Sequence, residues 1–200
     1  MEATVEGKAR SHRLKAETAA DHRDLDSRIL GAAPFSSRER YVGFLRVQEA
    51  FHRAIDALYT DPLLVQAIPS LEARQRIGSI RADLADLGEQ PSSASPLMLP
   101  DMDTAEAVGW LYVAEGSKLG AAFLSKAAAK LGLSDGFGAR HLAAAPEGRA
   151  EHWRGFTASL DGYALPPEAE DRVRDGARDA FRFYAALAER QFGAGADRGV

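Results

Sequence analysis

The sequence predicts an all-α protein with a single domain, and three observations support that prediction. Within each segment described below, apolar residues recur every three or four positions, and the alternation typical of strands is absent. Alanine, arginine and glutamate, which favour helices, are abundant, whereas β-branched residues are few. A length of 200 residues with 46% hydrophobic side chains suits one buried core.

The first helix is expected at about Ala9 to Leu30, after a flexible N-terminus at residues 1–8. Its apolar stripe consists of Leu14, Thr18, His22, Leu25 and Ile29. These positions lie within about 80° of one another on a helical wheel, so His22 is predicted to point towards the interior. Gly31 and Pro34 are predicted to end this helix.

Further helices are expected at about Ser37 to Tyr59, Leu71 to Leu87, Thr104 to Leu131, Glu147 to Leu160 and Glu168 to Phe192. Two of them begin at a capping box, namely Ser36 with Glu39 and Asp103 with Glu106. The Pro- and Ser-rich stretch from Gly88 to Asp103 is interpreted as a loop within one bundle. The domain is therefore predicted at residues 9–192, followed by a flexible tail at 193–200.

Composition excludes several classes of protein. With a formal net charge of −4, the chain lacks the basic excess that drives non-specific binding to nucleic acid. The absence of cysteine excludes thiol catalysis, thiolate metal sites and disulfides. The sequence has neither an apolar run of about 18 residues nor the N-terminus of a signal peptide. We therefore predict a cytoplasmic protein that binds neither nucleic acid nor membrane.

The expected helix from Thr104 to Leu131 contains three interior glycines, Gly109, Gly116 and Gly120. Each costs roughly 1 kcal/mol relative to alanine, so a second role must offset that cost. Gly116 and Gly120 lie one turn apart on the same face and leave it without side chains. Two interpretations remain open: close packing against another helix, or contact of a flat ligand with exposed backbone.

His22 is followed one helical turn later by Asp26. A histidine on an apolar stripe is most often a hydrogen-bonded core residue. A carboxylate at this spacing can instead accept a hydrogen bond from Nδ1, which leaves Nε2 available to a metal. Haem-ligating histidines are commonly oriented in this way. Both interpretations stay open.

The other histidines give weaker signals. Glu49 and His52 form one Glu-x-x-His element, but a carboxylate-bridged di-iron bundle needs a second, and the sequence has none. We interpret these two residues as a solvated or packing pair. His12, His141 and His152 have no partners at ligand spacing and are interpreted as surface or packing residues.

Two motifs resemble those of a known family. LKAETAADH, which contains Lys15, Thr18 and His22, is similar to the N-terminal haem-ligating segment of that family, the haem oxygenases. GWLYVAEGSKLGAAFL is similar to its glycine-rich distal helix. The strings FGARHL and HWRGF further on are most similar to the bacterial biliverdin-producing branch. The resemblance extends from roughly Leu14 to Phe192.

The resemblance implies an all-α fold in which haem lies between a proximal helix and a kinked distal helix. It assigns His22 as the axial iron ligand, and Asp26, where the family usually has Glu, as the residue that orients the imidazole. Lys15 would bind a haem propionate. Gly116 and Gly120 would let the distal helix bend over the haem and direct oxygen to a meso carbon. The implied reaction oxidises haem to biliverdin and releases carbon monoxide and ferrous iron.

Two positions depart from the family pattern. Ser117 stands, as it does in bacterial relatives, at the position where the mammalian-type enzymes carry a distal Asp. Proton delivery is therefore expected to depend on Ser117 and ordered water. The basic partner expected for a second propionate is replaced by Thr157. Lys126 is either a solvated surface lysine or the residue that holds this propionate in a haem rotated within its plane. Such a rotation would change which meso carbon is attacked.

The implied reaction requires partners. No flavin or nicotinamide motif is present, so a ferredoxin or a separate reductase must supply electrons. Biliverdin would serve a bacterial phytochrome as chromophore, or the reaction would recover iron from haem. A monomer is expected. Three alternatives remain: a haem carrier or sensor without turnover, an interaction protein whose glycines serve packing, and a di-iron oxidase that uses Glu49 and His52.

Overall fold

The computed structural model describes residues 9–97, 99 and 101–193, and within them the chain is helical without a β-strand. The helices are α1 (Arg10–Glu17), α2 (Ala19–Gly31), α3 (Arg38–Ala54), α4 (Pro62–Ala67), α5 (Ile77–Asp86), α6 (Thr104–Ala129), α7 (Arg149–Gly162) and α8 (Glu170–Phe192). Short 3-10 segments are η2 (Asp56–Thr60), η3 (Glu72–Arg74), η4 (Arg140–Leu142) and η5 (Pro167–Ala169). The predicted all-α fold is therefore confirmed, while the predicted flexible ends lie outside the described residues, apart from Gly193.

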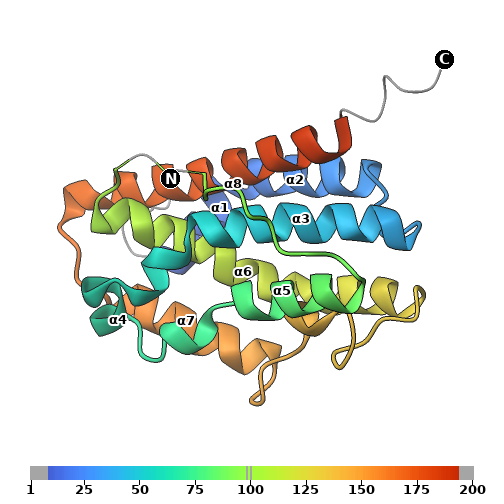
Figure 1. Cartoon of the computed structure of the whole chain (residues 1–200). Coiled ribbons are helices and arrows are strands. Elements are labelled where there is room, and N and C mark those ends of the chain that lie inside the picture. The colour runs from blue at the N-terminus through green and yellow to red at the C-terminus, as the bar shows by residue number, and fades with distance from the viewer. Residues whose placement is uncertain (1–8, 98, 100, 194–200) are drawn as a thin grey trace.

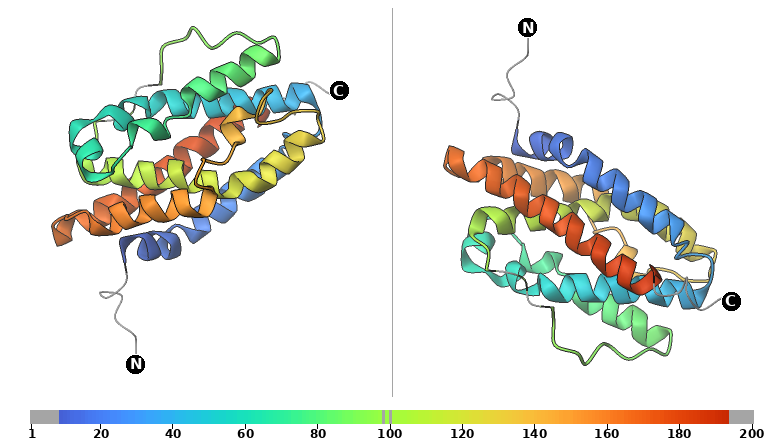
Figure 2. Two further views of the ribbon diagram at one scale, coloured as in Figure 1. Left: turned by 90° about the horizontal axis from the view of Figure 1, so that it is seen from below. Right: turned by 90° about the horizontal axis from the view of Figure 1, so that it is seen from above.

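Helix α6 runs through the middle of the bundle, with the other helices around it (Figure 1). α8 packs against α6 on one side, and α7 packs against α6 on the other. α2 and α3 both contact α8, and α5 contacts α3. The views of Figure 2 show α2 crossing over the C-terminal half of α6, the half that has diverged from α8, and Figure 1 shows α2 at a different height, beside α8. This arrangement sets the glycine-rich part of α6 opposite the helix that carries His22.

The N-terminal half of α6 is held against α8 by two glycines. A Cβ added at Gly109 would lie 2.1 Å from the carbonyl oxygen of Val173, and one added at Gly176 would lie 2.2 Å from that of Glu106. These distances are too short for any side chain, so the two backbones are in direct contact. The packing interpretation of the interior glycines is therefore correct for Gly109.

Two clusters of buried apolar side chains form the core. The larger cluster joins α3, α6, α7 and α8 and includes Phe51, Leu111 and Phe156. The smaller cluster joins α3 and α5 to the C-terminal half of α6 and includes Tyr41 and Leu84. Both halves of α6 are thus anchored, but by different partners.

The first helix is interrupted, which differs from the single helix predicted from Ala9 to Leu30. Thr18 is buried between α1 and α2, with φ −104° and ψ 7°, and its hydroxyl donates a hydrogen bond to the carbonyl of Leu14 at 2.8 Å. Such a bond from threonine to the preceding turn competes with regular helix geometry. The apolar period continues across the break, which is why the sequence pattern does not reveal it.

The other predicted boundaries hold with small differences. The predicted capping box of α6 is confirmed, with Asp103 accepting from Glu106 N at 3.0 Å and Glu106 accepting from Asp103 N at 2.9 Å. The N-cap of α3 is Ser37 rather than Ser36, because its side chain is the one that accepts from a backbone N–H of the first turn. The segments predicted as helices at 37–59 and 71–87 are each divided into an α-helix and a 3-10 turn.

Among the described helices, none combines the length and the apolar character needed to cross a lipid bilayer.

Candidate functional site

His22 is exposed on α2 and is paired with Asp26. Its Nδ1 is 3.0 Å from Oδ2 of Asp26, and the two side chains are 62% and 61% exposed. The prediction that His22 points into the core is wrong in this structure. No residue of α2 is buried, because the helix packs on α8 through half-buried residues only, and the imidazole meets Phe181 edge-on at 5.8 Å between ring centroids. Nε2 is therefore accessible while Nδ1 is held by a carboxylate.

Gly120 faces open space on α6 and Gly116 makes only ordinary contacts, in contrast to Gly109. A Cβ added at Gly120 would meet no atom within 4 Å, and one added at Gly116 would make ordinary contacts with the ring of Trp153 at 3.5 and 3.7 Å. Close helix packing therefore does not explain Gly120, and Gly116 also leaves room for a methyl group. A surface kept bare for a ligand stays a prediction.

Apolar side chains are exposed on the same face of α6. Leu119 is 45% exposed and Phe123 is 68% exposed, and helical geometry places both beside Gly116 and Gly120. Leu30, at the end of α2, is 66% exposed. Neighbouring exposed apolar side chains such as Leu119 and Phe123 indicate a binding surface rather than a solvated one. This apolar surface suits a flat and largely apolar ligand.

Three of the four predicted polar residues are exposed, and the fourth, Thr157, is half-buried. Ser117 is exposed, and its hydroxyl donates to the carbonyl of Ala114 at 2.7 Å. Lys15 and Lys126 are exposed, and neither forms an ion pair within the described residues. Thr157 turns its hydroxyl onto the carbonyl oxygens of its own helix. Both lysines therefore have free charges for an anionic group.

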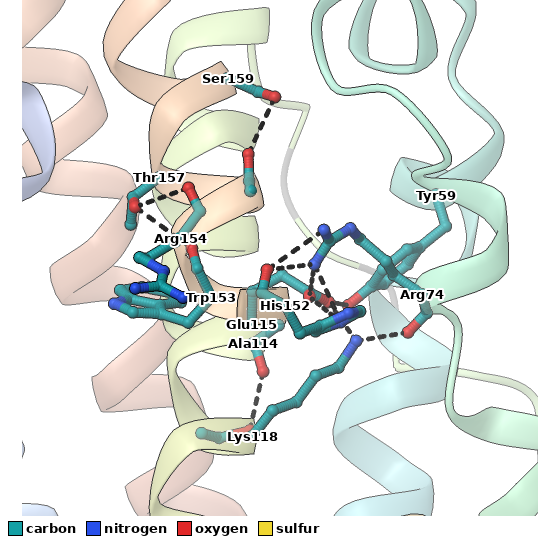
Figure 3. Close-up of polar contacts among 12 residues, drawn as sticks. Tyr59, Arg74, Ala114, Glu115, Lys118, His152, Trp153, Arg154, Thr157 and Ser159 are labelled. Atoms are coloured by element: carbon teal, nitrogen blue, oxygen red, sulfur yellow. Dashed lines mark hydrogen bonds and ion pairs between the residues drawn. The ribbon is translucent and has the colours of Figure 1, made fainter. Parts of the chain in front are cut away.

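A buried polar network, centred on Glu115, directly precedes Gly116 (Figure 3). The Glu115 carboxylate accepts from the Tyr59 hydroxyl at 3.0 Å and the Arg74 guanidinium at 3.0 Å. It also pairs with Lys118 Nζ at 2.7 Å, and His152 Nε2 lies 3.5 Å away. The network therefore ties α6 to η2, η3 and α7 at the point where the glycine-rich half begins.

The network keeps Glu115 ionised. Burial alone would raise its pKa, but the hydrogen bond with His152 and the nearby Lys118 ammonium lower that pKa to about 2. Sequence reasoning missed Glu115. The available signal was a Glu and a Lys three residues apart at the end of the apolar run GWLYVA, where two charged side chains need partners.

The remaining histidines have structural roles, apart from His12, which is exposed. His52 and Glu49 are buried rather than solvated, so only the packing half of that interpretation holds. His141 is buried, and its Nδ1 contacts Asp83 Oδ2 at 2.7 Å. Within the described residues no three His, Asp or Glu side chains are grouped as metal ligands, so the di-iron alternative lacks a site.

The site therefore combines an accessible histidine, oriented by a carboxylate, with a bare glycine face on a second helix of an all-helical fold. The family model for heme oxygenase matches residues 8–190. Heme oxygenase PigA of Pseudomonas aeruginosa is 45% identical over 184 residues, which cover 92% of this chain and 93% of that protein. The NO- and CO-bound heme oxygenase of Neisseria meningitidis superposes with a TM-score of 0.88 at 45% identity, covering 92% of each chain. The chain belongs to the heme oxygenase family, and its activity is that of a haem oxygenase.

Proposed function

We propose that His22 binds the iron of haem through Nε2 and that the glycine face of α6 covers the opposite side of the macrocycle. In this proposal the chain converts haem to biliverdin with release of carbon monoxide and ferrous iron. The observation that carries it is the exposed imidazole of His22, whose Nδ1 lies 3.0 Å from the Asp26 carboxylate. A neutral imidazole held in this way donates from Nδ1 and leaves the Nε2 lone pair for iron.

The residues of the proposed haem surface fit haem by their chemistry. Leu119 and Phe123 offer apolar contact for the macrocycle, and Gly120 leaves room for it against the backbone of α6. Lys15 and Lys126 are free to pair with the propionates. When bound, haem supplies both the iron and the ring that is oxidised. The role of the protein is to determine which edge of the ring lies beneath the glycine face.

We assign to Ser117 the placement of an ordered water above the haem. Its hydroxyl hydrogen is engaged by the carbonyl of Ala114, so the oxygen lone pairs are the part of the side chain available to a water. Proton delivery then passes through that water rather than through a carboxylate of the site.

The partners follow from the reaction. Electrons come from a ferredoxin or a separate reductase, and biliverdin either serves a bacterial phytochrome or is the by-product of iron recovery. We further propose a cytoplasmic monomer with its domain at residues 9–192. A haem carrier or sensor of the same fold is the alternative to turnover, and only formation of a bilin separates the two.

The axial ligand is tested by resonance Raman spectroscopy of the ferrous haem complex. The His22→Ala variant is expected to lose the iron–histidine stretching band and turnover, and added imidazole is expected to restore the band. His12→Ala is the matched control, because His12 is an exposed histidine on the neighbouring helix α1. An unchanged band in His22→Ala would show that another residue ligates the iron.

A further inference from the structure

A cavity lies on the other side of α6 from Gly116 and Gly120. It has a volume of about 500 Å³ and is bounded by the segment 69–79, by η4 and by the start of α7. Lys118 reaches it from α6, and helical geometry sets Lys118 nearly opposite Gly116. The cavity is therefore separate from the proposed haem surface.

The charges that line this cavity are predominantly positive. Its charged lining comprises Arg74, Arg76, Lys118, Arg140, Arg149 and a single carboxylate, Glu147, with two histidines beside them. Three of these cations already form ion pairs with carboxylates. Arg74 and Lys118 share Glu115, and Arg140 pairs with Asp83 and Asp86. Glu147 is itself engaged by His152 at 2.7 Å.

Two guanidinium groups remain without a carboxylate, those of Arg76 and Arg149. Arg76 is only 8% exposed, yet its guanidinium has no hydrogen-bond acceptor within the described residues. Arg149 donates to the backbone carbonyls of Lys118 and Leu142, which leave its charge uncompensated. Unpaired buried charge is unfavourable, and an anion held by the buried Arg76 and the half-buried Arg149 would remove that cost.

The electrostatics of Arg76 agree with this geometry. Burial lowers its pKa to about 10; Glu115 opposes that effect, and the charge of Arg149 adds to it. The two guanidinium groups therefore repel each other across the cavity. Burial, together with Arg76 and Arg74 and against the attraction of Glu115, likewise lowers the pKa of Lys118 to about 8.

We propose that this cavity binds a small phosphorylated molecule, whose phosphate group is held by Arg76, Arg149 and Lys118. The three cations come from three elements: Arg76 precedes α5, Lys118 lies on α6, and Arg149 begins α7. A tetrahedral phosphate can present oxygens to cations from three directions, whereas a carboxylate presents two in one plane. The cavity volume falls within the range of roughly 300 to 1,000 Å³ usual for small-molecule sites, so it has room for an ester beyond the phosphate.

Isothermal titration calorimetry on the purified full-length chain without haem tests this proposal independently of the haem site. The probes are inorganic phosphate, ribose 5-phosphate and acetate in a zwitterionic buffer. Both phosphates are expected to bind and acetate is not. Tighter binding of ribose 5-phosphate identifies the ligand as a phosphate ester, and tighter binding of inorganic phosphate identifies it as the free ion. Equal binding of acetate, or no heat with either phosphate, overturns the proposal.

Three variants locate the binding. Arg149→Gln is expected to weaken phosphate binding at least tenfold, and Arg154→Gln, an exposed arginine on the same helix α7, is expected to leave it unchanged. Glu147→Gln removes the only carboxylate of the lining and is expected to tighten phosphate binding, a gain that misfolding cannot produce. Equal losses in both arginine variants, or weaker binding in Glu147→Gln, contradict a phosphate site in this cavity.

Discussion

Gly109 of α6 and Gly176 of α8 lie at the point where the two helices cross, and each glycine is pressed against the backbone of the other helix. The glycines further along α6 do not share this role. Gly120 faces open space, and Gly116 touches only the ring of Trp153. One helix thus contains a packing glycine in its first half and, in its second, glycines with room for a side chain, where we propose that haem binds.

Gly109→Ala should therefore destabilise the protein strongly. The added methyl group would lie 2.1 Å from the carbonyl oxygen of Val173, and the helices would have to separate. Overpacking of this kind costs about 1–3 kcal/mol, and contact with rigid backbone favours the upper end of that range. Urea unfolding measures the loss. An unchanged unfolding midpoint would contradict the close contact between α6 and α8.

Gly120→Ala should lower activity without lowering stability. No atom lies within 4 Å of the added methyl group, and alanine favours a helix by roughly 1 kcal/mol over glycine, so stability should be kept or increased. Biliverdin formation should fall, because the methyl group would project into the space that we assign to haem. The rate of bilin formation and the urea midpoint are measured on the same preparation. Full turnover in a stable variant would argue against haem at this face.

Much of the fold follows from the periodicity of the sequence, and the places where it fails have physical causes. The break at Thr18 is invisible because the apolar stripe continues through it. His22 lies on that stripe but is exposed. Periodicity identifies which residues share a helix face, but it does not show which of them a neighbouring helix buries. Which glycine packs and which stays bare depends on the partner helix. Only the distances at Gly109 and Gly120 separate the two roles.

The buried ionic network was beyond sequence reasoning for a related reason. Glu115 contacts residues 59, 74 and 152, which the fold brings together from separate segments of the chain. The motif around Glu115 and Gly116 resembles a family signature, but the resemblance does not state which residue stabilises the helix.

Asp26→Asn should weaken haem ligation without disturbing the fold. Asp26 contacts Nδ1 of His22 at 3.0 Å and is 61% exposed, so its loss affects the imidazole more than the core. Replacing a residue that orients a metal ligand typically costs 10- to 100-fold in affinity or activity. Haem affinity is measured by absorption titration. Asp24→Asn on the same helix is the control, since Asp24 pairs with Arg28 instead, and equal effects of the two variants would rule out a special role for Asp26.

Glu115 should make stability depend on pH in the acid range. Its pKa is lowered from 4.5 to about 2, so its ion pairs stabilise the folded state fully above pH 4.5, and this stabilisation is lost as the pH falls towards 2. Glu115→Gln should cost about 3 kcal/mol at pH 7, because it leaves buried cations unpaired. The difference in urea midpoint between wild type and variant should shrink at pH 3. A difference that is constant with pH would contradict the lowered pKa, and Glu151→Gln, an exposed carboxylate, should show no effect at either pH.

Haem binding through His22 and the oxidation of the ring that follows are the two steps of the proposed function. The most direct measurement is an absorption titration of the purified chain with hemin, followed in the same cuvette by reductant in air with catalase present. We predict a Soret band that saturates at one haem per chain and then decays as biliverdin absorption appears, with both changes lost in His22→Ala. A Soret band that persists under reductant and air would indicate a carrier or sensor, and full turnover in His22→Ala would contradict the proposed ligand.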